Sequence, residues 1–215
     1  MSSLKSRPYR MRKRAEDVTG TRTRITAAAA RLHTTIGPSN TTVAAIASEA
    51  GVTRLTVYRH FADLDVLFEA CRAHWRAENP PPDAALWAAI PHLDERVQTA
   101  LTRLYAWYRD HAEELFPIYR DISTMPGSSQ TRMRDENRRL GRMLVGDAQP
   151  TDADHRVLLA AACHVLDFRT WRSLAIGQAL TDDEAVAVGV RLITTLGSDP
   201  RPRRGVRPRR CRGGA

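Results

Sequence analysis

The chain has 215 residues, of which 42% are apolar and 27% charged, so it has room for one large domain or for a small domain joined to a medium one. No apolar run approaches the length of a membrane span, and no apolar segment follows the basic N-terminus as a signal peptide would require. Three cysteines at unrelated spacings argue against a disulfide framework and favour a reducing cytoplasm. Abundant alanine and a mostly helical spacing of apolar residues predict an all-α fold.

The net charge of +9 is concentrated at the two ends of the chain. Residues 1–63 and 198–215 together carry 18 Lys and Arg against 5 Asp and Glu, whereas residues 64–197 carry 15 against 19. A basic end and a mildly acidic body are typical of a two-part nucleic-acid-binding protein. Only two of the 33 basic residues are lysine, however. The alternative is that the arginine bias reflects GC-rich coding and that the tails are merely solvated.

The first 20 residues are expected to form a disordered basic arm, followed by a helix that Thr21 or Thr23 caps. Such an arm could reach into a minor groove, or it could stay solvated and attract DNA only nonspecifically. Its candidate contacts are Arg10, Arg12, Lys13 and Arg14. The helix that follows places four apolar residues on one predicted buried face: Ile25, Ala29, Leu32 and Ile36.

Two short helices are expected next. The segment "GPSN" breaks the first helix, and Thr41 or Thr42 caps the second one. Gly51 permits a tight turn with positive φ, after which Thr53 caps a third helix over 53–60. A capped helix, a tight turn and a further short helix together predict a helix-turn-helix.

The third helix is unusually polar. In the stretch "AGVTRLTVYRHF" only Val57 and Phe61 are placed for burial, and most other side chains offer hydrogen-bonding groups. Such a helix fits the major groove, where Arg54 can form a bidentate contact with guanine and Leu55 can contact a thymine methyl group. Thr56 can either form a hydrogen bond to a base edge or contact a methyl group. Contacts to the phosphate backbone are expected from five residues: Thr41, Thr42, Thr53, Tyr58 and His60.

Residues 23–67, with "TTVAAIASEAGVTRLTVYRHFADLDVLF" at their centre, resemble the DNA-binding domain of the TetR family of transcriptional regulators. The shared pattern comprises a Thr-Thr helix start, an Ile-Ala pair, Ala-Gly-Val, a Thr or Ser cap, Tyr-x-His-Phe, and a Leu-Phe in the next helix. The resemblance implies the same three base contacts, and it implies backbone contacts from Thr42, Tyr58 and His60.

Two positions depart from the family's pattern. The family often has a lysine that meets a phosphate at the start of the fourth helix, where this chain has Leu64. Some members also read a base from an arginine early in the second helix, where this chain has Ala44 and Ala45. Sequence specificity should therefore rest more on Arg54 and on the N-terminal arm.

The rest of the chain is predicted to be helical as well. A fourth helix is expected to begin near Asp63 and to end at "PPPD", with one buried face made of Leu64, Leu67, Phe68 and Cys71. Pro117 is expected to bend or divide the next helical stretch, and the helices in this part are expected over 93–116, 130–146, 155–177 and 182–196. We divide the chain into an arm (1–20), a helix-turn-helix domain (21–66), a larger helical regulatory and dimerisation domain (67–197) and a disordered basic tail (198–215).

Members of the TetR family dimerise through their last two helices and release DNA when a small molecule binds the second domain. The resemblance implies a homodimer built on the helices over 155–177 and 182–196; the alternative is a monomer in which both are simply interior. It also implies a ligand pocket, although aromatic residues at helical spacing can equally form ordinary core. The pocket candidates are Trp107, Tyr108, His111, Tyr119, His164, Phe168 and Trp171.

No metal, cofactor or catalytic group is expected. Cys163 and His164 are neighbours on a helix and point about 100° apart, so they cannot readily converge on one metal ion. The predicted function is a cytoplasmic homodimeric repressor that a small molecule releases from a palindromic operator. The alternatives are a DNA-binding or architectural protein without a ligand, and a helical ligand-binding or catalytic protein whose helix-turn-helix is vestigial.

Overall fold

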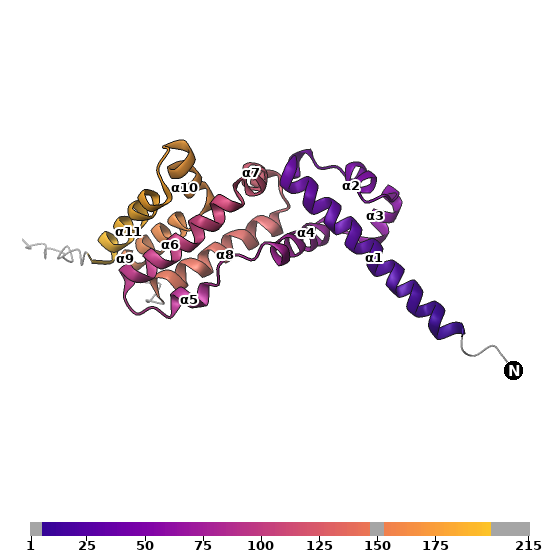
Figure 1. Cartoon of the computed structure of the whole chain (residues 1–215), viewed down its shortest axis with the longest axis horizontal. Coiled ribbons are helices and arrows are strands. Elements are labelled where there is room, and N and C mark those ends of the chain that lie inside the picture. Colours follow the sequence, from indigo (N-terminus) through magenta and orange to yellow (C-terminus); the bar gives the residue numbers. More distant parts are fainter. Residues whose placement is uncertain (1–5, 147–152, 199–215) are drawn as a thin grey trace, which may run out of the picture.

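The computed structural model describes residues 6–146 and 153–198, and within these ranges the chain forms helices and no strands (Figure 1). The expected all-α fold is therefore confirmed. The molecule is elongated, with the first four helices at one end and the last helices at the other (Figure 1). None of the helices in these ranges combines the length and the apolar character that crossing a membrane requires.

Four helices make up the N-terminal part: α1 (Ser6–Thr35), α2 (Val43–Glu49), α3 (Arg54–His60) and α4 (Leu64–Glu78). The hydroxyl oxygen of Thr42 accepts the amide of Ala45 at 3.1 Å, and that of Thr53 accepts the amide three residues further on, also at 3.1 Å. Both caps are as expected, and they fix where the two short helices begin. Gly51 lies in the turn between them with φ +65°, in the left-handed region that favours glycine.

The first helix begins much earlier than expected. α1 starts at Ser6, so the expectation of a disordered arm over 1–20 is wrong from that residue on, and residues 1–5 lie outside the described ranges. The segment directly after Pro8, "YRMRKRAE", consists mostly of good helix formers, with three Arg and one each of Met, Lys, Ala and Glu, and these favour helix without an inner cap. Pro8 itself stands in the first turn, where its missing N–H removes no helical hydrogen bond.

The N-terminal helices enclose a small core that includes Ile25, Ala29, Val57, Phe61, Leu67 and Cys71. Two residues of the predicted buried faces are exposed instead, because Ile36 is 41% and Leu64 is 46% exposed. Ile36 follows the last residue of α1, and Leu64 is the first residue of α4. Both therefore lie at helix ends, beyond the layer in which the helices pack.

The C-terminal part contains α5 (Ala84–Ala88), α6 (Leu93–Asp110), α7 (Ala112–Arg120), α8 (Gly127–Val145), α9 (Ala153–Val165), α10 (Phe168–Arg172) and α11 (Asp182–Ser198). Short turns of other helix types are η1 (Pro38–Asn40), η2 (Ile122–Thr124) and η3 (Ser173–Gly177). α11 lies where the last helix was expected. The tail beyond it, predicted to be disordered, falls outside the described residues from 199 on.

Two predicted boundaries in this part are wrong. The chain breaks at His111, not at Pro117, and α7 continues through the buried proline at the cost of one helical hydrogen bond. The helix expected over 155–177 is interrupted at Asp167. The Asp167 carboxylate accepts the amide of Arg169 at 2.8 Å, so this side chain starts α10 instead of letting α9 continue.

Two tyrosine hydroxyls donate hydrogen bonds to backbone carbonyls at the end of α9, inside the larger core. The last carbonyls of a helix lack partners within it. Tyr105 donates to the carbonyl of Val165 at 2.8 Å, and Tyr108 donates to that of Leu166 at 2.7 Å. These bonds fasten α6 to the break before α10, and they are surrounded by fully buried aromatic residues such as Trp87, Phe168 and Trp171.

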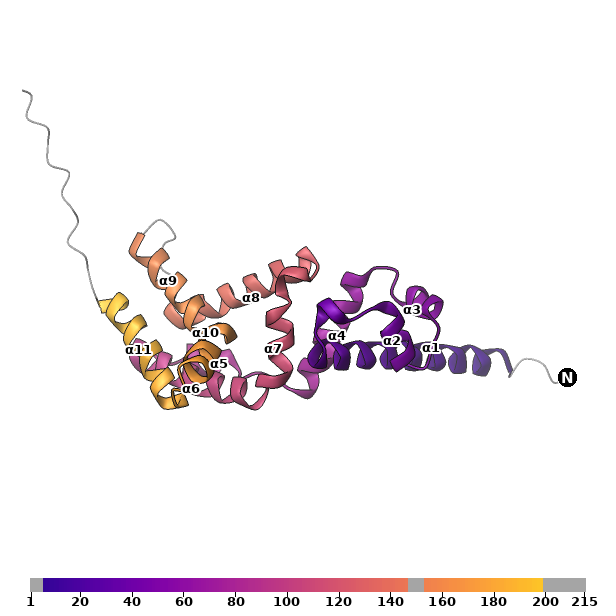
Figure 2. The same ribbon diagram turned by 90° about the horizontal axis from the view of Figure 1, so that it is seen from above.

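Two helices join the N-terminal part to the C-terminal part. α7 lies between them and packs against α1 on one side and against α6 and α10 on the other (Figure 2). α4 packs against both α1 and α8. Its residues Leu67 and Cys71 belong to the N-terminal core, so the boundary proposed after residue 66 falls inside a helix that both parts share.

Candidate DNA-binding surface and internal cavity

α3 turns its polar side outward. Val57 is fully buried, whereas Leu55 is 73% exposed, Tyr58 is 49% exposed and Arg54 is exposed beside them. Within the described residues, Arg54 has no hydrogen-bond or ion-pair partner. The surface therefore presents a free guanidinium next to an apolar side chain, which suits the edges of base pairs.

The threonines expected at phosphates differ in how far they are engaged. Thr42 is exposed, and since its oxygen accepts the capping amide, its O–H group remains to donate. Thr53 is also exposed, and its hydroxyl lies 2.9 Å from that of Thr56. Thr41 is half-buried and donates its hydroxyl to the carbonyl of Gly37 at 2.8 Å. Of these, Thr42 has the hydroxyl best placed for a phosphate.

An arginine that the sequence alone did not single out holds the end of α3. Arg22 of α1 donates to the carbonyl of His60 at 2.5 Å, and its guanidinium lies 3.9 Å from the centre of the Phe61 ring. Partial burial, followed by the positive charges of Arg59 and Arg22, lowers the pKa of His60. A neutral imidazole would contact a phosphate through a hydrogen bond and not through an ion pair.

A cavity of about 650 Å³ lies between the N-terminal and the C-terminal helices. α1, α4, α6, α7 and α8 all contribute to its walls, and its volume is typical of small-molecule sites. Of the seven predicted pocket residues, Trp107, Tyr108 and Tyr119 lie on these walls. They come from α6 and α7, so the two helices on either side of the His111 break meet in one site.

The other four predicted pocket residues lie elsewhere. His111 is not part of the wall, although its ring centre lies 5.1 Å from that of Trp107, which is. Phe168 and Trp171 are fully buried in the C-terminal core. His164 is exposed on the surface of α9. Helical spacing alone therefore did not separate residues that face the cavity from residues that fill the core.

Part of the wall comes from the N-terminal helices: His33 and Thr34 lie on α1, in the predicted DNA-binding domain, and Phe68, Cys71 and Trp75 lie on α4, just beyond its predicted boundary. The rings of His33 and Phe68 stack with their centres 4.6 Å apart. Burial lowers the pKa of His33 to about 4, so its imidazole is neutral at pH 7. In the sequence, the residue that could have indicated this part of the wall is Trp75, a large aromatic residue one helical turn beyond the predicted buried face of α4.

Ion pairs join α4 to α8 along one edge of the cavity. Glu136 on α8 binds both Arg72 and Arg76, and the Arg76 Nη1 atom lies 2.6 Å from its Oε1 atom. Burial alone would raise the pKa of Glu136, but the two arginines lower it, so the carboxylate stays charged. Nearer the start of α4, two further contacts extend this seam: Arg132 with Glu69, and Ser128 with Asp65.

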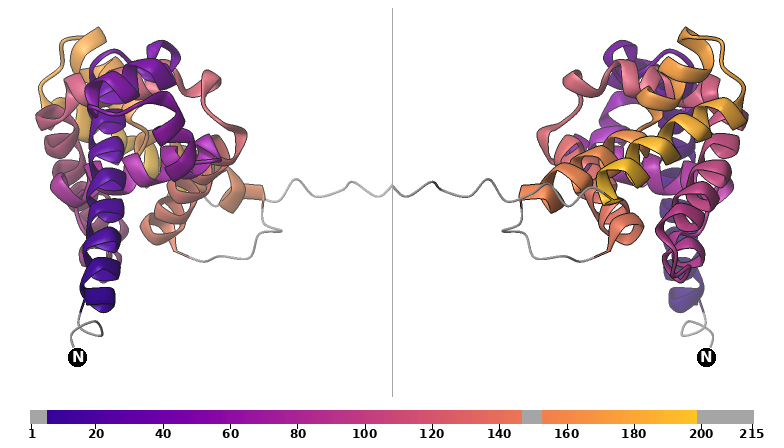
Figure 3. Two further views of the ribbon diagram at one scale, coloured as in Figure 1. Left: turned by 90° about the vertical axis from the view of Figure 1, so that its right-hand side faces the viewer. Right: turned by 90° about the vertical axis from the view of Figure 1, so that its left-hand side faces the viewer.

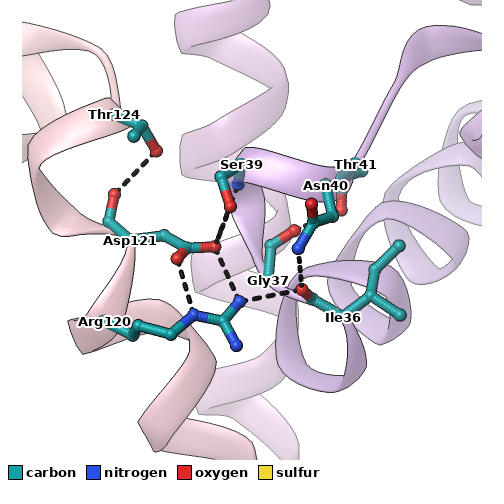
Figure 4. Close-up of polar contacts among 8 residues, drawn as sticks. All are labelled: Ile36, Gly37, Ser39, Asn40, Thr41, Arg120, Asp121 and Thr124. Carbon is teal, nitrogen blue, oxygen red and sulfur yellow. Dashed lines mark hydrogen bonds and ion pairs between the residues drawn. The ribbon is translucent and has the colours of Figure 1, made fainter.

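The end of α7 holds the loop that follows α1 (Figure 4). Oδ2 of Asp121 accepts both the amide of Ser39 at 3.1 Å and its hydroxyl at 2.6 Å. Arg120 donates to Asp121 at 2.7 Å and to the carbonyl of Ile36 at 2.9 Å. These donors, Arg120 first, lower the pKa of Asp121 below its usual range. We call this set, made of Ile36, Ser39, Arg120 and Asp121, the interdomain clasp.

Gly37 is required by the clasp. Its φ of +92° favours glycine, and a Cβ there would overlap the side chains of Arg120 and Asp121. Gly37→Ala is therefore expected to lower the free energy of unfolding by about 1–3 kcal/mol, measured by urea denaturation. Gly20→Ala is the matched control, since a Cβ added there meets no atom within 4 Å, and it should stabilise α1 by up to about 1 kcal/mol. Wild-type stability in Gly37→Ala would contradict the close packing of the clasp.

A family model described as "Bacterial regulatory proteins, tetR family" matches residues 25–71. The matched region runs from the buried part of α1 through α2 and α3 to Cys71 on α4, which is the same extent as the N-terminal core. A search of curated proteins found no match to the chain. A search of solved structures likewise found none.

Proposed function

The chain belongs to the TetR family of bacterial regulatory proteins, and on this premise we propose that it is a homodimeric repressor which a small molecule releases from a palindromic operator. Membership of this family makes it a DNA-binding transcriptional regulator. The observation that best supports the finer proposal is the position of the cavity. Its walls include α1, which contacts the end of α3, and α4, which follows α3 in the chain. A repressor works where the DNA is, so we place it in the cytoplasm.

We assign the reading of base edges to Arg54, Leu55 and Thr56. The free guanidinium of Arg54 at the start of α3 supports this assignment, because a bidentate contact to guanine needs two guanidinium N–H groups that have no other partner. The phosphate contacts proposed beside them come from Thr41, Thr42, Thr53, Tyr58 and His60. The further contacts predicted for the N-terminal arm concern side chains that lie outside the described part of the chain.

Exposed apolar side chains on α9 and α11 support dimerisation through these helices. Val157 is 43% exposed, Val188 is 45% exposed and Leu192 is 39% exposed. α9 packs against α11, and Figure 1 shows the two helices at the end of the molecule opposite α2 and α3, the end that faces the viewer in the right-hand view of Figure 3. A second copy on this face would bury these side chains in a four-helix contact. The two α3 helices could then meet successive major grooves, about 34–36 Å apart.

The mass of the protein in solution tests this dimer. Wild type is expected to have the mass of two chains by light scattering, and the double variant Val188→Glu, Leu192→Glu is expected to have the mass of one. Placing two carboxylates in a buried apolar contact opposes association, because each loses its water without a partner. Leu86→Glu on α5 is the control, since it changes an exposed leucine elsewhere on the surface, at 55% exposure. A double variant that remained dimeric would move the interface away from α11.

The cavity supports release by a ligand. α7 carries Tyr119 on the cavity wall, and the next two residues, Arg120 and Asp121, belong to the clasp. A ligand that favours another position of α7 would move the loop after α1 and change the spacing of the two α3 helices. The shift can be no larger than the difference in the ligand's affinity for the two states. A regulator without a ligand would be expected to have a filled core at this place.

A further inference from the structure

Two carboxylates on the cavity wall, Glu114 and the exposed Asp83, have no arginine or lysine partner among the residues that the structure describes, and Glu114 is the one beside the aromatic rings. Glu114 on α7 lies on the wall, and its Oε2 atom accepts the indole N–H of Trp75 at 3.0 Å. In the described part of the chain, the basic group within 4 Å of Glu114 is His111, whose Nδ1 lies 3.4 Å from the same oxygen. Two other carboxylates of the wall, Glu136 and Asp167, each bind arginine.

Aromatic rings stand beside this carboxylate. Trp75 and Trp107 meet edge to face with their ring centres 5.8 Å apart, and Trp107 lies 5.6 Å from Tyr108. All three residues line the cavity. The face of an aromatic ring carries partial negative charge, so it attracts a cation and disfavours an anion. The rings and the carboxylate therefore favour the same sign of charge in a ligand.

The arginines of the wall are the feature that would favour an anion instead. Arg169 is held by Asp167 through two contacts at 2.8 and 2.9 Å. Arg72 and Arg76 are held by Glu136, although they share one carboxylate between them. The remaining two arginines of the wall are exposed on α8: Arg134 and Arg139. Three of the five arginines on the wall are thus engaged by carboxylates, whereas Glu114 has no arginine partner among the described residues.

Resting on the function proposed above, we propose that the effector is an organic cation with an extended aromatic body, and that Glu114 is its counter-ion. A volume of about 650 Å³ accommodates a body of several rings, which would pack on Trp75 and Trp107. Glu114 stands six residues before Arg120 on α7. An ion pair with the ligand therefore acts on the helix whose end forms the clasp.

Two probes of the same shape and opposite charge test the sign of the ligand. Tetraphenylphosphonium and tetraphenylborate are titrated into the full-length protein by calorimetry. The phosphonium is expected to bind at least about tenfold more tightly than the borate, and Glu114→Gln is expected to weaken the phosphonium about tenfold. Glu113→Gln is the matched control, because Glu113 is exposed on the same helix and lies outside the cavity wall. It should leave phosphonium binding unchanged.

The proposal is overturned if the borate binds as tightly as the phosphonium, if neither binds, or if Glu114→Gln binds the phosphonium as wild type does. The proposed function has a separate test, which is release of the wild-type protein from its operator by cell extract. Release by extract without phosphonium binding would remove the cationic ligand and keep the regulator. Phosphonium binding without release by any extract would keep the cation site and remove the inducible repressor.

Discussion

Replacing Arg54 with alanine is expected to weaken operator binding by about 1–3 kcal/mol in each half-site, while binding to random DNA changes much less. The side chain is exposed at the start of α3 and has no partner among the described residues, so its guanidinium can form both bonds to a guanine without first breaking another contact. Its removal should also relax the preference at one base pair per half-site.

Fluorescence anisotropy with operator and scrambled duplexes measures both effects at one salt concentration, since salt alone changes DNA affinity strongly. Tyr58→Phe provides the comparison. That change removes a hydroxyl expected at a phosphate, so it should weaken all sequences about equally. If Arg54→Ala lowered binding to both duplexes by the same factor, Arg54 would be a phosphate contact and the base reading would have to come from elsewhere.

The second large effect is a loss of stability in mild acid that depends on His33. Burial lowers its pKa in the folded protein from 6.5 to about 4, so between these values the unfolded chain takes up a proton that the folded chain does not. The free energy of unfolding is therefore fully present above pH 6.5 and falls as the pH drops towards 4. A shift of this size corresponds to a loss of roughly 3 kcal/mol at the acid end.

Urea denaturation of wild type and His33→Phe at several pH values between 7 and 4 isolates this contribution. Phenylalanine keeps an aromatic ring against Phe68 but cannot take up a proton. The difference in unfolding free energy between wild type and variant should therefore change with pH by roughly 3 kcal/mol, in favour of the variant in acid. Parallel curves would show that His33 is not the group that titrates.

The N-terminal part could be predicted in detail because its signals are local. Thr42, Thr53 and Gly51 act within three or four residues of their own positions, so the sequence suffices to place them. Val57 and Phe61, predicted to be buried while the rest of α3 faces outward, are 0% and 1% exposed. The start of α1 was missed because no single cap marks it, and a helix can continue wherever its residues favour one.

The cavity and the clasp could not be predicted in the same way, because they depend on contacts between distant residues. Ser39 and Asp121 are 82 positions apart, and nothing near either residue indicates the other. Tyr108 and Phe168 both fit a helical apolar face, but only Tyr108 reaches the cavity. Phe168 is the first residue of α10, after the interruption at Asp167, and it is fully buried with its ring centre 5.4 Å from that of Tyr108.

The most direct test of the regulator is the selection of bound fragments from sheared genomic DNA, sequenced with and without cell extract as a source of ligand. A homodimer that a ligand releases should enrich fragments which share one short palindrome, and the enrichment should disappear when extract is present. Enrichment of fragments without a shared palindrome, at the same level with and without extract, would contradict sequence-specific and inducible binding and would favour an architectural DNA-binding protein.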